Sequence, residues 1–222
     1  MPVLNEAQRV RDSIEQIRSL DSNVEIIIVD GLSDDDTAER AKACGVSVHS
    51  SSPGRGVQCN VGAEHASGDI LIFQHIDSTL PNGALELLKQ EFLRTDVQVG
   101  TFRMRFDLNH WFLNMSGYLT RFDSILTRFG DQCIVVRRNF FNELGGFPDW
   151  PLFEDVEFLR RARKRTRIWS FPMEVITSAR RFQKNGIYRQ QMFNGLLVLQ
   201  YCFGADVKKL AEKYRNFGRR KK

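Results

Sequence analysis

Acidic residues follow two short apolar segments of this sequence. Asp77 comes four residues after the apolar run 70–73, and Asp30 directly follows a predicted strand at 24–29, whose last four residues, 26–29, form a second apolar run. Apolar runs this short, with no polar face, are typical of strands buried on both sides of a parallel sheet. Ligands of open α/β sheets bind beyond the carboxyl ends of the strands, so both carboxylates are candidates for a ligand site. Capping of a helix that begins near Pro81 is the alternative role of Asp77.

Glu154 and Asp155 form a second acidic pair, at the start of a predicted helix that continues through Phe158 and Leu159. Acids in the first turn of a helix complement its macrodipole, which is the structural interpretation of the pair. A general base that begins a helix beside a ligand site is the functional interpretation. The sequence pattern alone leaves both open.

Predicted strands and helices alternate along the first half of the chain. Asn5 precedes apolar residues at helical spacing, which predicts an N-capped helix. Such close alternation predicts right-handed βαβ units, and hence an α/β fold with a mostly parallel sheet flanked by helices. The predicted order is helix 6–20, strand 24–29, a helix ending near 44, strand 46–49, helix 57–66 and strand 70–73.

The second half is predicted to contain further helices and strands. Apolar spacing indicates a helix near 84–92, a strand at 97–106, a strand near 130–137 and a C-terminal helical segment between 185 and 214. An aromatic-rich amphipathic helix lies between these strands, and we expect its apolar stripe to pack in the core. That stripe consists of Trp111, Met115, Leu119, Phe122 and Leu126.

Composition limits the classes of function. The 222 residues are 42% hydrophobic and 27% charged, which suits a globular protein with a sizeable core. The net charge is +5, and basic runs at 160–167 and 219–222 are either solvated or contact anionic phosphates or lipid headgroups. No nucleic-acid motif accompanies them, which disfavours that partner. The apolar stretch 195–203 is too short to span a bilayer. Four widely spaced cysteines predict free thiols in a reducing compartment, so we expect a cytoplasmic protein.

Short motifs occur in a characteristic order over nearly the whole chain. They include Asp30 with Gly31, the triplet 130–132 and the acidic pair at 154–155. Together they resemble the family 2 glycosyltransferases of the GT-A fold, and most closely a bacterial subgroup of small, soluble transferases associated with radical-SAM or selenium-domain proteins. The other motif residues are Pro2, Asn5, Glu6, Ile28, Val29, Ser33, Asp36, Thr37, Gly54, Arg55, Gly56, Gln58, Asn60, Gly62, Gly68, Asp69, Ile70, Leu71, His75, Ile76, Asp77, Gly145, Gly146, Phe147, Ser178, Ala179, Arg180, Arg181 and Gly186.

The resemblance implies a nucleotide-sugar site in the N-terminal half, with UDP- or GDP-linked donors. Glu6 would face the nucleoside, and Asp30 would accept a hydrogen bond from the base. Asp77 corresponds to the last acid of the family's DxD motif and would hold Mn²⁺ or Mg²⁺, ions that prefer oxygen ligands. The implied donor-site residues are Pro2, Asn5, Glu6, Asp30, Gly31, Arg55, Gln58, Asn60, His75 and Ile76.

The resemblance also implies an acceptor site in the second half. Asp155 would be the general base that removes the proton from an acceptor hydroxyl, with Glu154 beside it. Direct displacement with inversion needs one carboxylate base, whereas glycoside hydrolases use two flanking carboxylates. The residues implied on the acceptor side are Asp131, Gln132, Arg180 and Arg181.

The chain departs from the family pattern at two places. His75 stands where the DxD motif has its first acid, and only a short stub precedes Asn5 where an apolar strand is usual. A nucleotide-sugar-binding protein or scaffold that has lost turnover is therefore the alternative to an active transferase. Nucleotidyl transfer is disfavoured, because Asn5 and Glu6 stand where a Gly-rich basic loop would follow the first strand.

We expect a single domain over residues 1–222, with a donor half (1–100), an acceptor half (101–182) and C-terminal helices (183–222). The last part carries an apolar stripe that is predicted to pack across the acceptor side. A basic amphipathic segment that rests peripherally on a membrane surface is the alternative. The first of two helices carries this stripe as Met192, Leu196, Leu199 and Phe203, and the second helix carries another as Val207, Leu210 and Tyr214.

Overall fold

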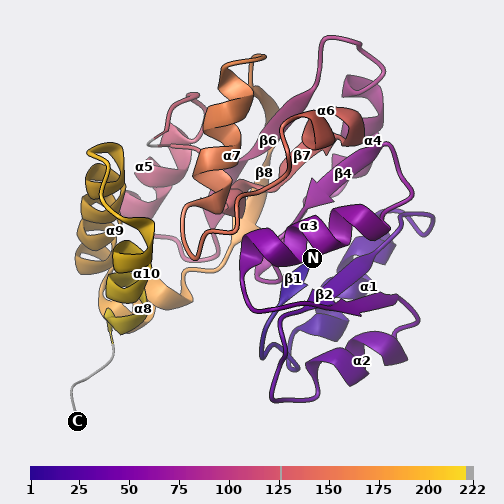
Figure 1. The fold of residues 1–222 in the computed structure, drawn as a ribbon, viewed down its shortest axis with the longest axis horizontal. Helices are drawn as coiled ribbons and strands as arrows, with labels where there is room; N and C mark the ends of the chain where they lie inside the picture. Colours follow the sequence, from indigo (N-terminus) through magenta and orange to yellow (C-terminus); the bar gives the residue numbers. More distant parts are fainter. Residues whose placement is uncertain (126, 219–222) are drawn as a thin grey trace.

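The computed structural model describes residues 1–125 and 127–218 and contains two β-sheets with helices packed around them (Figure 1). A parallel sheet has the strand order β1-β2-β3, and a mixed sheet has the order β4-β7-β6-β8-β5. The first sheet consists of β1 (Pro2–Val3), β2 (Ile27–Asp30) and β3 (Ser47–Ser50). The second consists of β4 (Ile70–Phe73), β5 (Ser78–Thr79), β6 (Val99–Phe106), β7 (Ile134–Arg137) and β8 (Trp169–Thr177).

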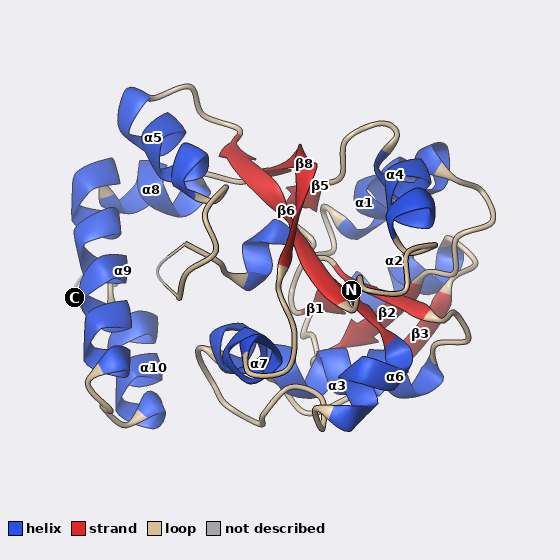
Figure 2. Ribbon diagram, turned by 90° about the horizontal axis from the view of Figure 1, so that it is seen from above, coloured by secondary structure: helices blue, strands red, loops and turns tan. Residues whose placement is uncertain are grey.

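Helices surround both sheets, and the last two lie at the end of the molecule opposite β1–β3 (Figure 2). Helix α3 packs on β1 and β2, and α5 packs on β6. The helices are α1 (Val10–Leu20), α2 (Thr37–Ala43), α3 (Arg55–His65), α4 (Ala84–Glu91), α5 (Trp111–Leu119), α6 (Arg138–Glu143), α7 (Glu154–Arg163), α8 (Arg180–Asn185), α9 (Ile187–Cys202) and α10 (Val207–Asn216).

The predicted α/β class with flanking helices and a C-terminal helical segment is confirmed, but the sheet is less parallel than predicted. Strands β1 to β3 are parallel. Strand β4, which was expected in a parallel sheet, instead pairs antiparallel with β7, from Ile70 opposite Arg137 to Phe73 opposite Ile134. A continuous apolar run reports burial on both faces and carries no information about the direction of the neighbouring strand.

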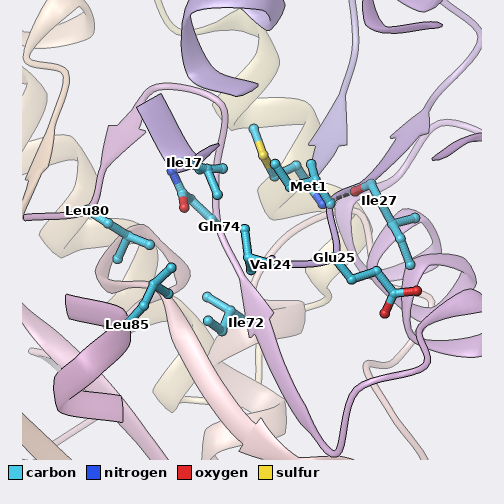
Figure 3. A pocket seen from close by; sticks show the side chains of 10 residues that line it. Met1, Ile17, Val24, Glu25, Ile27, Ile72, Gln74, Leu80 and Leu85 are labelled. Carbon is cyan, nitrogen blue, oxygen red and sulfur yellow. Dashed lines mark hydrogen bonds between the residues drawn. The ribbon is translucent and has the colours of Figure 1, made fainter. Parts of the chain in front are cut away.

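The short stub before Asn5 forms the two-residue strand β1. Its two residues pair with β2, and the Met1 ammonium group donates to the Ile27 carbonyl at 2.7 Å. A small apolar pocket lies beside this contact, between β2 and β4 (Figure 3). Its polar side chains are already hydrogen-bonded, because Glu25 accepts from the Ser67 N–H and Gln74 donates to the Ser78 carbonyl of β5. The pocket therefore lacks groups for chemistry. It is lined by Met1, Ile17, Val24, Glu25, Ile26, Ile27, Ile72, Gln74, Leu80 and Leu85.

Helix α1 begins later than predicted, at Val10, and Asn5 is not its N-cap. Asn5 has a positive φ of 55°, and its side-chain oxygen accepts from the Asp34 N–H at 2.8 Å. Its own N–H donates to the Ser33 hydroxyl at 2.9 Å. Asn tolerates the left-handed region, and its local hydrogen bonds compete with helix formation. The segment before α1 is thus tied to the loop after β2.

The C-terminal end of β4 is held by aromatic packing. Phe73 contacts Phe141 of α6, with ring centroids 5.1 Å apart, and Phe147, at 4.9 Å. Phe147 in turn contacts Phe158 of α7 at 4.8 Å. Aromatic pairs in these tilted and edge-on geometries add to the stabilisation from burial. The cluster therefore fixes the end of β4 relative to α7.

The predicted core packing of the aromatic-rich helix is wrong. The buried residues of α5 are Leu113 and Gly117, and a Cβ on Gly117 would lie 2.6 Å from the Met104 carbonyl oxygen. The small face of the helix therefore approaches β6, and the large side chains point outward. The exposed members of the predicted stripe are Trp111, Met115, Leu119 and Phe122. Leu126 lies outside the described residues.

The predicted packing is wrong for the first C-terminal stripe, whereas Leu210 of the second is buried in a cluster with Tyr214. Helix α9 buries Gln190, Leu197 and Val198, and packs through them against α10 and its neighbours. The stripe lies on the other face and is exposed at every position. Its residues are Met192, Leu196, Leu199 and Phe203.

Gly100 of β6 provides a test of the packing between β6 and β8. A Cβ there would lie 2.7 Å from the Phe171 ring and 2.9 Å from the Trp169 carbonyl oxygen. We predict that Gly100→Ala lowers the free energy of unfolding by about 1–3 kcal/mol, because overpacking displaces neighbours. Urea denaturation measures this value. Gly195→Ala on the open face of α9 is the control, and should raise stability by about 0.5–1 kcal/mol. Equal effects of the two substitutions would contradict the packing argument.

Candidate functional site

The first turn of α7 carries the acidic pair that the sequence singled out. Phe153, with a φ of 64°, turns the chain into the helix, so that Glu154 and Asp155 are its first two residues. Asp155 accepts hydrogen bonds from the Gly130 N–H and, at 2.7 Å, from the Val156 N–H. The helix start is therefore confirmed, and the Asp155 carboxylate is held in one orientation beside another segment of the chain.

Gly130 begins a single 3₁₀ turn, Gly130–Gln132, that lies between Asp155 and His75. A Cβ on Gly130 would lie 3.0 Å from Asp155 Oδ2 and 3.1 Å from His75 Nε2. The absence of a side chain at Gly130 therefore lets both side chains lie close to this turn. Sequence reasoning placed Gly130 in a motif but did not count it as a site residue. The Gly-Asp-Gln triplet was the available signal.

His75 and Asp131 form an ion-pair contact at the end of β4, with 3.0 Å between His75 Nδ1 and Asp131 Oδ1. Burial alone would raise the pKa of Asp131, but the His75 hydrogen bond and the charges of His75, Arg55 and Arg181 lower it to about 2. Asp131 is therefore ionised near neutral pH. The ionised Asp131 carboxylate contacts Nδ1 of the His75 ring. The other ring nitrogen, Nε2, lies near Gly130, as Asp155 does.

Arg55 and Glu154 connect α3 to α7, with 3.2 Å between Arg55 Nε and Glu154 Oε1. Burial raises the pKa of Glu154, the Arg55 charge opposes this, and the neighbouring Asp155 carboxylate adds to it. Burial would lower the pKa of Arg55, but the nearby carboxylates raise it overall. Gly56 allows the close approach, since a Cβ there would lie 2.6 Å from the Pro148 carbonyl oxygen. Arg55 thus lies among the carboxylates of Glu154, Asp155 and Asp131.

Asp77 lies in the turn between β4 and β5 and contacts Arg180 of α8, with Oδ2 and Nη2 3.4 Å apart. The same Arg180 nitrogen lies 2.9 Å from Glu6 Oε1. Hydrogen bonds from Arg180 and Arg9 outweigh the effect of burial and lower the pKa of Glu6. Asp77 does not cap α4, whose N-cap is Gly83. The structure therefore brings Asp77 together with Glu6, which was implied at the donor site, and Arg180, which was implied on the acceptor side.

Other residues implied by the resemblance use their polar atoms inside the protein. Buried Gln58 donates to the carbonyls of Val3 and Val29, each at 2.8 Å. Asn60 donates to the Phe147 carbonyl and accepts from its N–H, each at 2.9 Å. Their amides hold α3 against the strands and against the loop before α7.

Asp30 and Gln132 are also buried. Asp30 accepts from both the backbone N–H and the hydroxyl of Ser33. Gln132 is fully buried, donates to the Thr127 carbonyl and accepts from the Thr101 hydroxyl. Pro2 lies in β1, and Gly31 donates to the Val3 carbonyl. These residues build the frame around the site, and their implied contacts with substrates stay predictions.

The site therefore combines five acids with three arginines. The acids are Glu6, Asp77, Asp131, Glu154 and Asp155, and the arginines are Arg55, Arg180 and Arg181. Arg181 belongs to this group because its charge acts on Asp131 and on Arg55. Carboxylates suit a hard divalent cation, and guanidinium groups suit phosphate oxygens. The arrangement can bind both kinds of charge side by side.

Solved structures share this fold over most of the chain. A mannosyltransferase from Pyrobaculum calidifontis, in complex with GDP-Man and Mn²⁺, superposes with a TM-score of 0.70 at 16% identity, covering 97% of this chain and 68% of that protein. Glucosyl-3-phosphoglycerate synthase from Mycobacterium tuberculosis, in complex with Mn²⁺, UDP-glucose and glycerol 3-phosphate, superposes with a TM-score of 0.61 at 20% identity, covering 92% and 79%. At these identities the likeness concerns the fold.

Sequence comparison gives a curated relative and a family. The chain is 32% identical over 103 residues to 4,4'-diaponeurosporenoate glycosyltransferase of Staphylococcus haemolyticus. That stretch covers 42% of this chain and only 28% of the relative's length. The sequence model of glycosyl transferase family 2 matches residues 1–145, well over half of the chain. The chain therefore belongs to glycosyl transferase family 2.

Proposed function

We propose that this protein is a metal-dependent, inverting glycosyltransferase that moves a sugar from a UDP- or GDP-linked donor to a hydroxyl acceptor. The observation that carries the proposal is the placement of Asp155, held beside His75 at the Gly130 turn. Membership of the family supports the reaction class. The GDP-Man and UDP-glucose complexes of the two proteins with this fold support the donor class. Membership of the small, soluble subgroup is part of the same proposal.

Asp155 would remove the proton from the acceptor hydroxyl as that oxygen attacks the anomeric carbon. The N–H groups of Gly130 and Val156 orient its carboxylate. Glu154 is buried and paired with Arg55, so it positions the helix start and leaves Asp155 as the base. One base suffices for direct displacement, which inverts the anomeric centre. The proton moves to Asp155, and the sugar–phosphate bond breaks.

Asp77 would hold the metal ion. Among the described residues no group of three or more His, Cys, Asp or Glu side chains could hold a metal ion. A single carboxylate can still serve Mg²⁺ or Mn²⁺, because these ions are commonly bound by one or two carboxylates together with substrate phosphates. When bound, the ion would neutralise charge on the departing diphosphate. Arg180 already contacts Asp77, so its guanidinium group stands where it could reach the same phosphates.

We predict that Asp155→Asn lowers turnover about 10²- to 10⁴-fold, because the amide cannot accept the proton. Donor binding should stay unchanged. Release of UDP or GDP from a panel of nucleotide sugars with Mn²⁺ measures turnover, and calorimetry measures binding. Asp149→Asn, an exposed acid on the loop before α7, is the matched control. Full activity of Asp155→Asn would exclude this base, and donor binding without turnover in the wild type would favour the binding-protein alternative.

We predict that removal of divalent metal with EDTA abolishes turnover and weakens donor binding, and that Mn²⁺ or Mg²⁺ restores both. Asp77→Asn should raise the Mn²⁺ concentration needed for half-maximal activity by about tenfold or more, because one anionic ligand is lost. Asp34→Asn, in the loop after β2, is the control. Turnover that is unchanged by EDTA would contradict metal dependence.

The Asp131–His75 contact predicts a pH dependence of stability. The pKa of Asp131 is lowered to about 2 in the folded protein. The unfolded value is about 3.9, so the stabilisation is present above about pH 4 and is lost as the pH falls toward 2. The difference in melting temperature between wild type and Asp131→Asn should therefore shrink as the pH falls through this range. A difference that stays constant in thermal melts would show that Asp131 is not held ionised by its partners.

A further inference from the structure

Helix α9 presents a largely apolar face to solvent. Met192 is 75% exposed and Phe203, the C-cap of the helix, is 84% exposed. Arg189 is the one charged residue of the helix, and its guanidinium group lies over the Phe217 ring, 5.0 Å from the centroid. The other exposed positions are Tyr188, Met192, Gly195, Leu196, Leu199, Cys202 and Phe203. A surface helix normally places charged residues on its solvent-facing side, whereas α9 places apolar residues there.

Helix α5 and the turn after it extend this face. Trp111, which is 63% exposed, donates from its indole N–H to the Tyr188 hydroxyl at 3.2 Å. Phe112 also packs on Tyr188, with ring centroids 5.2 Å apart. We call the combined surface the apolar end face. It consists of Trp111, Met115, Tyr118, Leu119, Phe122, Tyr188, Met192, Leu196, Leu199 and Phe203. Exposed apolar side chains gathered on neighbouring helices in this way indicate an interaction site.

Positive charge is concentrated in the C-terminal part of the sequence. Residues 180–222 contain twelve Lys and Arg but only two acids, a net charge of +10, whereas the whole chain has +5. The remainder of the chain is therefore net acidic, at −5. Helix α10 packs directly on α9, and Lys213 of α10 donates to Gln200 of α9 at 2.7 Å. Lys213 of this basic helix therefore lies beside α9.

These basic side chains are not neutralised by neighbours. In the described part of the chain, no salt bridge involves the basic residues of α9 and α10, which are Arg189, Lys208, Lys209, Lys213 and Arg215. The other basic run behaves differently. Arg160 pairs with Glu157, and Arg163 pairs with Asp123, each at 2.7 Å. The positive charge beside α9 is therefore available to an anionic partner.

We propose that the apolar end face docks the protein on an anionic lipid bilayer, with the α9 stripe at the acyl boundary and the basic residues of α10 at the headgroups. Amphipathic helices bind such surfaces through buried apolar area together with attraction to anionic lipid. Trp and Tyr favour this interface, and Trp111 and Tyr188 meet at the junction of the two helices. No described helix is long and apolar enough to cross a membrane, so the helix lies along the surface.

A second copy of this chain fits the face less well than a bilayer does. Face-to-face pairing would bring two net-positive C-terminal segments together, and like charges repel at short range. An anionic bilayer can bury the apolar stripe and attract the basic residues of α10 at the same time. The docking extends the proposed function without depending on it, because it uses no residue of the candidate site.

The test is co-sedimentation of the full-length protein with vesicles, in the absence of donor. Phosphatidylcholine vesicles are compared with vesicles of phosphatidylcholine and phosphatidylglycerol at a ratio of roughly 3:1. We expect binding to the mixed vesicles, at least about tenfold weaker binding to phosphatidylcholine alone, and weakening by added salt. A blue shift of tryptophan fluorescence on vesicle addition should be lost in Trp111→Phe.

Variants separate the apolar and charge contributions. Met192→Glu with Leu199→Glu should weaken vesicle binding about tenfold or more, because two apolar side chains lose their burial. Leu93→Glu changes an even more exposed leucine, 83% exposed, just after the C-cap of α4 and should have no effect. Lys208→Gln and Lys209→Gln, which leave the apolar end face intact, should each weaken binding about fivefold. Circular dichroism checks that every variant is folded.

Several outcomes would overturn the proposal. These are absence of binding to the mixed vesicles, equal binding to both vesicle types with no salt dependence, and wild-type binding by the folded Met192→Glu/Leu199→Glu variant. Sedimentation velocity gives a further one. A stable dimer that this variant dissociates, without vesicle binding by the wild type, would assign the face to a second copy of the chain.

Discussion

The contact between the Gly130 turn and the first turn of α7 is the interaction on which the candidate site depends. It brings Asp155 of α7 and His75, which follows β4, to the same glycine. The helix start would not lie there without the phenylalanine cluster that packs α7 against β4. Because Glu154 of the same turn pairs with Arg55, the contact also joins α7 to α3. One helix start thus connects the mixed sheet to the parallel one.

Charge is distributed unevenly between this site and the C-terminal helices. Within the site each arginine lies among carboxylates, and Arg180 bridges Glu6 and Asp77 from segments more than seventy residues apart in sequence. Such mutual pairing limits the cost of collecting charges in a partly buried site. The basic residues of α9 and α10 lack this compensation. Arg181 lies between the two regions, since it acts on Asp131 and also bonds the Tyr214 hydroxyl of α10.

Local patterns predicted many elements well. The apolar run at 70–73 is strand β4, and the acidic pair at 154–155 begins α7. Such predictions succeed where the burial pattern of an element and the residues that mark its ends lie within the same short segment. The start of α1 was predicted wrongly, because the bonds of Asn5 to Ser33 and Asp34 come from a loop some thirty residues away. A local capping pattern cannot report a competing partner at that distance.

The sequence by itself determined the α/β class, the order of most elements and the acids at strand ends and at the start of α7. It did so because burial and helix signals repeat over a few residues. Only the tertiary structure decided that Gln58 and Asn60 bond to the backbone, that β4 pairs antiparallel with β7, and that the stripes of α5 and α9 face outward. The physical reason is that periodicity shows which face of an element is apolar, whereas contacts with distant segments decide what covers that face.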